Sequence, residues 1–223
     1  MKITDLHKGF DNFSLHIESL EITEKKIYGL IGPNGCGKTT VMKLMAGLAS
    51  PESGTIDYEN LARQDITMVM RKPYLLHDTV YRNLVYPLKL RKIKPDKDLI
   101  EHYLEITGLS NRRDEYAPQL SGGEQQKLAL ARALIFSPSL IFIDEAFSNM
   151  DIESVAFFEN YILEEQKKHP RTWVIISHQL SIIKRLCDYV YFMYNGKIAI
   201  SGATNEVLES SENEKLKQFL KYQ

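Results

Sequence analysis

The sequence is short of cysteine, of long apolar runs and of excess charge of either sign. Only two cysteines occur, Cys36 and Cys187, and the N-terminus, Met-Lys-Ile-Thr-Asp-Leu, lacks the apolar stretch of a secretory signal. No apolar run approaches the roughly 18 to 20 residues that cross a bilayer. We therefore expect a protein of the reducing cytoplasm, and any membrane role must come through a partner.

The charge balance excludes another class of partner. The chain has 28 Lys plus Arg and 29 Asp plus Glu, a formal net charge of −1, so no overall field favours nucleic acid or anionic lipid. We expect no nucleic-acid partner. At 223 residues the chain is long enough for one large globular domain, with smaller lobes at most.

Short apolar runs alternate with helical patterns along much of the chain. The runs lie at residues 27–31, 67–70, 140–143, 173–176 and 189–193, and helical patterns at 38–48, 99–107, 124–136, 154–168 and 180–187. Apolar runs of this length are typical of buried strands, and their alternation with helices predicts an α/β fold with a mostly parallel, covered sheet.

Two segments depart from this alternation. Phe13, Leu15 and Ile17 recur at a period of two, which predicts a small antiparallel β lobe formed by about 1–26 and 52–70. Residues 72–125 carry helical patterns separated by prolines and predict a helical lobe. The remainder is expected to form the core of a single domain spanning 1–223, with a charged, helix-prone tail over 205–223.

Residues 32–39 match the phosphate-loop pattern G-x-x-x-x-G-K-[ST], directly after one predicted strand and before a predicted helix. Glycines let backbone N–H groups surround phosphate oxygens, and the positive end of the helix faces the same anion. Lys38 would bridge the β- and γ-phosphates and Thr39 would ligate Mg²⁺. The alternative is a glycine turn with a solvated lysine. The predicted ATP-contacting set is Gly32, Pro33, Asn34, Gly35, Cys36, Gly37, Lys38, Thr39 and Thr40.

The sequence allows two roles for Cys36. It is a small residue that fills a tight turn, or a thiol whose pKa is lowered by the helix terminus and Lys38, which would make it reactive when no nucleotide covers it.

Two adjacent acids end the apolar run at 140–143. Asp144 and Glu145 should lie at the carboxyl end of a central strand, where open parallel sheets bind ligands. Asp144 would hold Mg²⁺, and Glu145 would polarise the attacking water. The alternative is an exposed polar strand end.

Residues 120–126 read Leu-Ser-Gly-Gly-Glu-Gln-Gln and predict a second anion-binding helix terminus. Ser121 and Glu124 form an S-x-x-E capping box, and Gly122 and Gly123 expose backbone N–H groups. One nucleotide cannot easily use two such termini from the same chain, so Ser121, Gly122 and Gly123 are expected to grip the γ-phosphate held by another subunit. Alone, the segment could equally be an ordinary capped helix.

The order of these motifs, followed by Ser-Asn-Met-Asp at 148–151 and an isolated His178 after a strand, resembles the ATP-binding cassette (ABC) family over essentially the whole chain. The resemblance implies the ABC ATPase fold and ATP hydrolysis. It implies that His178 contacts the γ-phosphate and that Asp151 lies in the loop joining the subunits of a homodimer. Phe10 is the aromatic expected to stack on adenine, with Phe13 as the competitor.

The sequence also departs from the family. The family has a glutamine after the strand at 67–70, whereas this chain has Arg71, and a guanidinium has no lone pair to offer a metal. Arg71 would contact the γ-phosphate, respond to the membrane partner or point to solvent, and hydrolysis could be slow or partner-dependent. Ala146 replaces the usual proline, and Asn149-Met150 is unusual in the joining loop.

Residues 73–91 resemble the start of the helical lobe in bacterial importer subunits, of tungstate, molybdate or phosphate type. In that family the segment borders a groove that receives a helix of the membrane protein; alternatively, it serves the core of the lobe itself. The implied partners are integral membrane permease subunits and an extracytoplasmic solute-binding protein, with this chain on the cytoplasmic face. The alternatives are a non-transport ABC ATPase and a weakly hydrolysing regulator.

Overall fold

The central sheet has the strand order β5-β6-β7-β3-β8-β9 in the computed structural model, which describes residues 1–148, 150–210 and 212–221. Strands β5, β6, β7, β3 and β8 run parallel to one another, and β9 is the antiparallel edge strand. The strands are β3 (Ile27–Ile31), β5 (Ile66–Val69), β6 (Leu140–Asp144), β7 (Thr172–Ile176), β8 (Tyr189–Tyr194) and β9 (Lys197–Ala203). The predicted α/β fold with a mostly parallel sheet is confirmed.

A second, antiparallel sheet has the order β2-β1-β4, with β1 (Lys2–Phe10), β2 (Phe13–Glu21) and β4 (Ser53–Asp57). The assignment of 52–70 as a whole to this lobe is corrected at its end. Strand β5 pairs with β6 in the central sheet, because its residues continue the buried parallel ladder.

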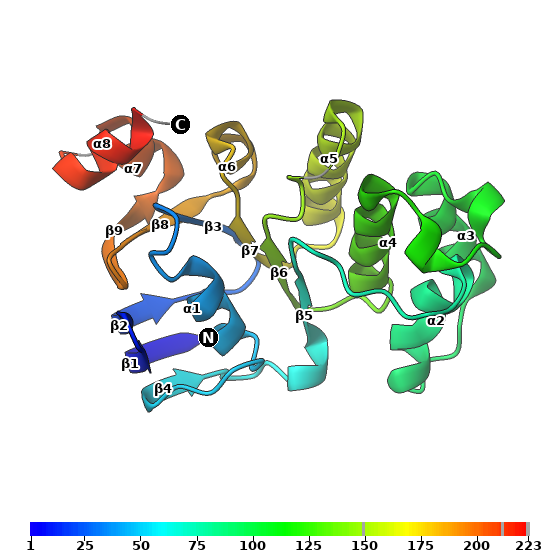
Figure 1. Ribbon diagram of the computed structural model, residues 1–223, viewed down its shortest axis with the longest axis horizontal. Helices are drawn as coiled ribbons and strands as arrows, with labels where there is room; N and C mark the ends of the chain where they lie inside the picture. The colour runs from blue at the N-terminus through cyan, green and yellow to red at the C-terminus, as the bar shows by residue number, and fades with distance from the viewer. Residues whose placement is uncertain (149, 211, 222–223) are drawn as a thin grey trace.

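Helices cover both faces of the central sheet (Figure 1). They are α1 (Lys38–Met45), α2 (Val80–Leu90), α3 (Lys97–Ile106), α4 (Gly122–Leu134), α5 (Ile152–Lys168), α6 (Leu180–Leu186), α7 (Thr204–Ser210) and α8 (Glu214–Leu220), with short 3₁₀ turns at Arg63–Asp65, Ser110–Arg112 and Ala117–Gln119. Helices α2, α3 and α4 lie together to one side, and the antiparallel sheet lies on the other. None of the helices described is long and apolar enough to cross a bilayer.

Alternate residues of the strands feed two cores. Phe142 of β6 and Val174 of β7 pack with α1 and the antiparallel sheet on one face. Ile141 and Ile175 pack with α4, α5 and α6 on the other. All five residues of β6 are buried, so this strand is continuously apolar until Asp144. Packing on both faces of the sheet therefore fixes the strand ends that carry the polar motifs.

Candidate functional site

Four neighbouring parallel strands end at one edge of the central sheet, and each is followed there by residues that the sequence predicts to belong to the site. Strand β3 leads into residues 32–39, β5 into Arg71, β6 into Asp144 and Glu145, and β7 into His178. Because the carboxyl ends of parallel strands share an edge, motifs up to 146 residues apart in sequence meet in space. The topology therefore brings these residues to the edge of the sheet at which β3 leads into α1.

The phosphate loop depends on glycine at two points where a side chain does not fit. Gly32 has φ +147, and a Cβ there would lie 2.2 Å from the carbonyl oxygen of Met193. Gly37, which precedes α1, has φ +103, and a Cβ there would lie 2.9 Å from the ring of Phe13. The loop can therefore pass close to β8 and to the β1–β2 hairpin while it turns into the helix.

Lys38 is the first residue of α1 and its side chain folds back over the loop. Its ammonium donates hydrogen bonds to the carbonyl oxygens of Gly32, at 2.7 Å, and Pro33, at 2.9 Å. The residue is 7% exposed, so these carbonyls solvate a nearly buried charge. A phosphate oxygen at the loop would offer the same ammonium a charged acceptor.

Thr39 and Asp144 bring a hydroxyl and a carboxylate together. The Thr39 hydroxyl donates to Asp144 at 2.9 Å and 3.1 Å to the two carboxylate oxygens. Burial raises the pKa of Asp144, with the Thr39 hydrogen bond acting in the opposite direction. Hydroxyl and carboxylate oxygens are hard donors of the kind that Mg²⁺ selects, and a dication would offset the cost of burying this charge. The residues present therefore fit the magnesium ion that accompanies ATP.

Glu145 lies beside His178 and Arg71, in a backbone conformation that is rare for residues other than glycine. Its φ is +51, and its N–H donates to the carbonyl of Ile176 at 3.0 Å. One carboxylate oxygen lies 2.6 Å from Nε2 of His178, and the other lies 3.2 Å from Nη1 of Arg71. The second oxygen is buried, and its contact with Arg71 is an ion pair without hydrogen-bond alignment. The carboxylate is thus held between an imidazole and a guanidinium.

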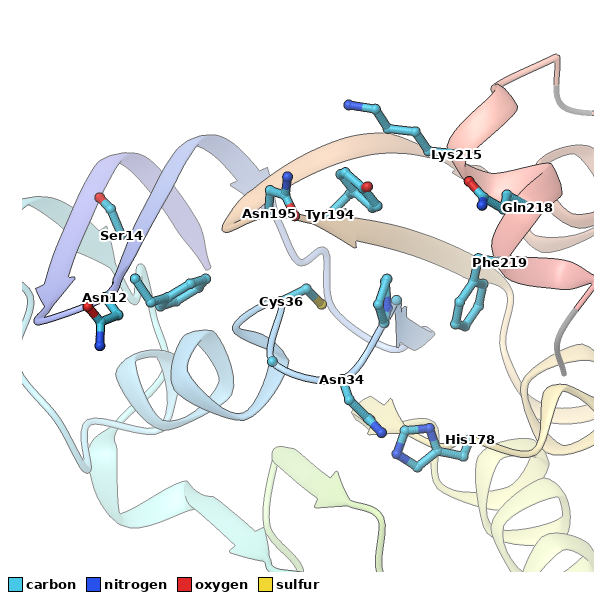
Figure 2. Close-up of a pocket in the computed structure, with 14 residues that line it drawn as sticks. Asn12, Ser14, Asn34, Cys36, His178, Tyr194, Asn195, Lys215, Gln218 and Phe219 are labelled. Atoms are coloured by element: carbon cyan, nitrogen blue, oxygen red, sulfur yellow. The ribbon is translucent and has the colours of Figure 1, made fainter.

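Two cavities flank the phosphate loop. The smaller, about 370 Å³, is lined by Phe10, Phe13 and the start of α1, and it reaches Glu145. The larger, about 720 Å³, lies between the loop, the β8–β9 turn and α8, with Tyr194, Lys215 and Phe219 in its wall (Figure 2). Of these two cavities, the smaller is lined by Thr39 and Glu145 and the larger by His178.

The two candidate adenine-stacking rings both lie at this smaller cavity. Phe10 is 51% exposed, and its ring centroid lies 6.2 Å from that of Phe13. Phe13 packs against Gly37, whereas Phe10 presents an open face. An exposed ring on a packed neighbour is suited to stacking on a base.

The expected reactivity of Cys36 is not supported by its surroundings. Its side chain is buried, and burial raises the pKa of the thiol more than the nearby charge of Lys38 lowers it. The prediction of a lowered pKa was therefore wrong in direction, because sequence adjacency to Lys38 does not reveal how completely the loop covers the sulfur. The alternative, a small residue that fills a turn, agrees with the packing.

The segment 121–123 begins α4 as expected but lies apart from the phosphate loop of the same chain (Figure 1). Ser121 accepts from the N–H of Glu124, whose carboxylate accepts from the N–H of Ser121 at 2.9 Å. Around Gly122 there is open space. Among the described residues that line the two cavities, none comes from 121–123 or is Asp151. Asp151 caps α5 by accepting from Ser154, and Asn149 before it lies outside the described residues.

One residue that matters for the site was not singled out by its sequence. Gln126 is fully buried, and its side-chain amide donates to the carbonyl of Met70 at 3.2 Å. This contact ties the first turns of α4 to the backbone next to Arg71. Gln126 is the last residue of the 120–126 motif, but the sequence alone does not indicate which distant carbonyl its side chain contacts.

Comparison with known proteins agrees with this geometry. A family model described as "ABC transporter" matches residues 15–148. The tungstate uptake system ATP-binding protein TupC of Peptoclostridium acidaminophilum is 36% identical over 206 residues, covering 88% of this chain and 95% of that protein. The methionine import ATP-binding protein MetN 4 of Oceanobacillus iheyensis is 32% identical, covering 99% of this chain and 70% of that protein.

Solved structures share the fold. CbiO1 of Clostridium perfringens superposes with a TM-score of 0.75 at 24% identity, over 94% of this chain and 90% of that one. A bacterial Atm1-family ABC exporter with ATP bound reaches 0.85 at 22% identity, over 99% of this chain and 41% of that one. The fold and site define a P-loop ATPase of the cassette type. The chain belongs to the ABC transporter family, as an ATP-binding subunit that hydrolyses ATP.

Proposed function

We propose that this subunit works on the cytoplasmic face of the membrane and energises the import of a solute through separate permease subunits. The observation that carries the proposal is the meeting of Lys38, the Thr39–Asp144 pair and the Glu145–His178 pair at one sheet edge. Both relatives compared above are named as uptake or import proteins, which favours import. The solute is selected by other subunits, including an extracytoplasmic solute-binding protein.

Each side chain has a distinct task in hydrolysis. Lys38 exchanges its loop carbonyls for the β- and γ-phosphate oxygens, while the glycine-lined backbone and the amino end of α1 hold the remaining charge. Thr39 and Asp144 would hold Mg²⁺, which would neutralise charge that develops on the phosphates. Glu145 accepts the proton of the attacking water as general base, and His178 orients Glu145 and contacts the γ-phosphate. Phe10 stacks on the adenine.

The site is completed by a second copy of the chain. Residues 121–123 line neither cavity at the phosphate loop of their own chain, yet Ser121 and Gly122 are exposed at the amino end of α4, where a helix terminus attracts anions. A head-to-tail homodimer places them against the γ-phosphate of the partner's nucleotide, with Asp151 in the joining loop. ATP then favours the closed dimer because these contacts exist only there.

The permease subunits would dock on the helical lobe. A groove of about 410 Å³ lies between β5, α2 and α4, with Tyr74, Tyr86 and Leu90 on its rim. These side chains are 71%, 40% and 62% exposed. Exposed aromatic and apolar side chains at a groove suit the insertion of a partner helix. Met70 also lines the groove, so docking there adjoins Arg71 and Glu145.

The test is steady-state ATP hydrolysis with Mg²⁺ by the purified chain beside Glu145→Gln, with Glu105→Gln on the exposed side of α3 as the matched control. Loss of the general base should lower kcat by at least about 100-fold and trap an ATP-bound dimer in gel filtration, while the control stays at the parent rate. Unchanged hydrolysis in Glu145→Gln would remove the assigned base. Transport itself is tested by co-purification with an integral membrane protein; isolation only in soluble complexes would favour the non-transport ATPase.

A further inference from the structure

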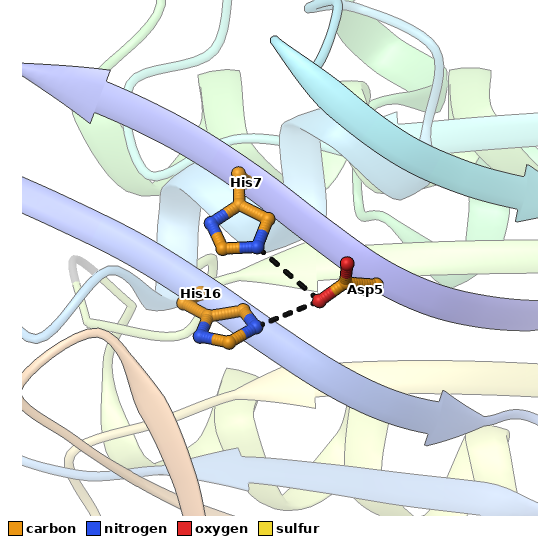
Figure 3. Close-up of side chains that lie close together, drawn as sticks. All are labelled: Asp5, His7 and His16. Carbon is orange, nitrogen blue, oxygen red and sulfur yellow. Dashed lines mark hydrogen bonds and ion pairs between the residues drawn. The ribbon is translucent and has the colours of Figure 1, made fainter.

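Three metal-ligating side chains converge on the antiparallel sheet, away from the nucleotide site (Figure 3). Nε2 of His7 lies 3.2 Å from Oδ1 of Asp5, and Nε2 of His16 lies 2.9 Å from the same oxygen. One ligand atom from each residue lies within 4.8 Å of the others. ATP binding and hydrolysis use none of the three.

The backbone brings the two imidazoles as close as two strands allow. His7 and His16 are direct partners in the β1–β2 register. The carbonyl of His7 accepts a hydrogen bond from the N–H of Glu52 at 2.9 Å, and the N–H of His16 donates to the carbonyl of Gly196 at 2.8 Å. These two backbone groups therefore do not bond across the β1–β2 pair. Such non-hydrogen-bonded pairs have the shortest Cα separation, about 4.5 Å. The rings accordingly stack with centroids 3.9 Å apart.

Asp5 reaches the imidazoles because β1 is irregular at this point. The pairing with β4 shifts by one residue between Thr4 and His7, and Asp5 has φ +46. Gly54 accommodates the displaced backbone, since a Cβ there would lie 2.1 Å from the carbonyl oxygen of Asp5. In a regular strand the Cα atoms of residues 5 and 7 would lie about 6.6 Å apart. A bulge of this kind re-aims a side chain, here toward both histidines.

We propose that Asp5, His7 and His16 bind a first-row transition-metal dication, with Zn²⁺ as the reference ion. Two imidazole nitrogens and a carboxylate oxygen form a donor set that suits zinc, nickel and copper. With metal–ligand distances of 2.0 to 2.2 Å, neighbouring donors of a tetrahedral shell lie roughly 3.3 to 3.6 Å apart. The two nitrogen–oxygen separations, 2.9 Å and 3.2 Å, are slightly shorter than this, and the three ligand atoms lie within 4.8 Å of one another, so a fourth position would be left for water.

This site differs in chemistry from the oxygen ligands at Thr39 and Asp144. Mg²⁺ prefers oxygen donors and holds its waters, so it does not compete effectively for the imidazoles. Zinc binds through the free lone pair of each imidazole nitrogen, so the metal ion and the proton compete for the same atoms. A bound ion would cross-link β1 and β2 in the hairpin that also carries Phe10 and Phe13.

The test is calorimetric titration of Zn²⁺ into the chelator-stripped, nucleotide-free full chain with excess Mg²⁺ present. One ion should bind per chain, and His7→Ala and His16→Ala should each weaken affinity by at least about 10-fold, the loss seen even for outer-shell changes in metal sites. Cobalt substitution should give the visible absorption of a tetrahedral site, and this absorption should disappear in both variants. Circular dichroism at matched temperature confirms that the variants are folded.

Two further variants separate this site from other sources of imidazole. His102→Ala, on the exposed side of α3, and His178→Ala, at the nucleotide site, should both leave zinc affinity unchanged. Loss of binding in His178→Ala would place the ion at the nucleotide site and overturn the proposal. Absence of saturable binding, or binding that survives His7→Ala combined with His16→Ala, would overturn it as well.

Discussion

Arg71 and Glu145 are paired across two neighbouring parallel strands, with Nη1 and Oε2 3.2 Å apart. Val69 of β5 lies opposite Ile143 of β6, and two residues further along each chain the register brings the arginine to the glutamate. The family-typical glutamine at this position is neutral, so the substitution places a positive charge directly on the proposed general base. A guanidinium on this carboxylate competes with the attacking water for its oxygens.

We predict that Arg71→Gln raises basal ATP hydrolysis about 2- to 5-fold. The guanidinium is 62% exposed, and partly exposed ion pairs contribute about 1 kcal/mol or less, which sets the upper end of this range. The measurement is kcat for the parent and variant at saturating ATP and Mg²⁺. Lys72→Gln, which removes an adjacent exposed charge, should leave kcat unchanged. A lower kcat in Arg71→Gln would instead show that the arginine assists the γ-phosphate.

His178→Ala tests the other partner of Glu145. The imidazole lies 2.6 Å from the carboxylate, at the end of β7, and its removal should lower kcat by about 100-fold or more while the KM for ATP changes little. His102→Ala is the control and should retain parental kinetics. A rise in KM with unchanged kcat would assign His178 to nucleotide binding alone.

The sheet and its polar edge could be predicted because their signals are local. Apolar runs ending in Asp144-Glu145 or in His178 show both the strand and the point where it ends, and the parallel order then implies convergence. The assignment of 52–70 went wrong at β5 because this four-residue strand has the same local pattern whichever sheet it joins. Only the pairing partner, β6, decides the matter.

Other features depend on contacts that no sequence pattern encodes. The burial of Cys36 depends on the path of the whole loop, which the sequence does not show. Adjacency to Lys38 therefore suggested a lowered pKa for the thiol, whereas burial raises it. The cluster of Asp5, His7 and His16 depends on a bulge and on a neighbouring glycine at position 54. In the sequence, two histidines nine residues apart show no spacing typical of a metal site.

Cys36 should react slowly with iodoacetamide in the nucleotide-free chain. Burial raises its pKa above the usual 9.0, so the thiolate fraction at pH 8 is smaller than in a free thiol, and the rate should rise only at higher pH. The measurement is the pH dependence of labelling in a Cys187→Ala background, with the urea-unfolded chain as the control. Labelling faster than that of the unfolded chain would restore the hypothesis of an activated thiol.

The shared nucleotide site makes a quantitative prediction for mixed dimers. Lys38→Ala removes the ammonium of the phosphate loop. Gly122→Asp places a negative charge where the γ-phosphate of the partner's ATP should lie. The open space around Gly122 lets the aspartate fit without disturbing the fold. Each variant alone should be inactive. Mixed at equal amounts, about half of the dimers contain one of each chain and have one intact composite site, which gives about a quarter of parental ATPase activity.

The matched control for this experiment mixes Lys38→Ala with a chain that carries both substitutions. No dimer in that mixture has an intact phosphate loop, so activity should stay at background. Recovery in the first mixture and none in the control requires that one ATP be held by Lys38 of one chain and by Gly122 of another. If neither mixture recovers activity although dimers form, the segment 121–123 does not act on the partner's nucleotide, and its exposed donors serve only to cap α4.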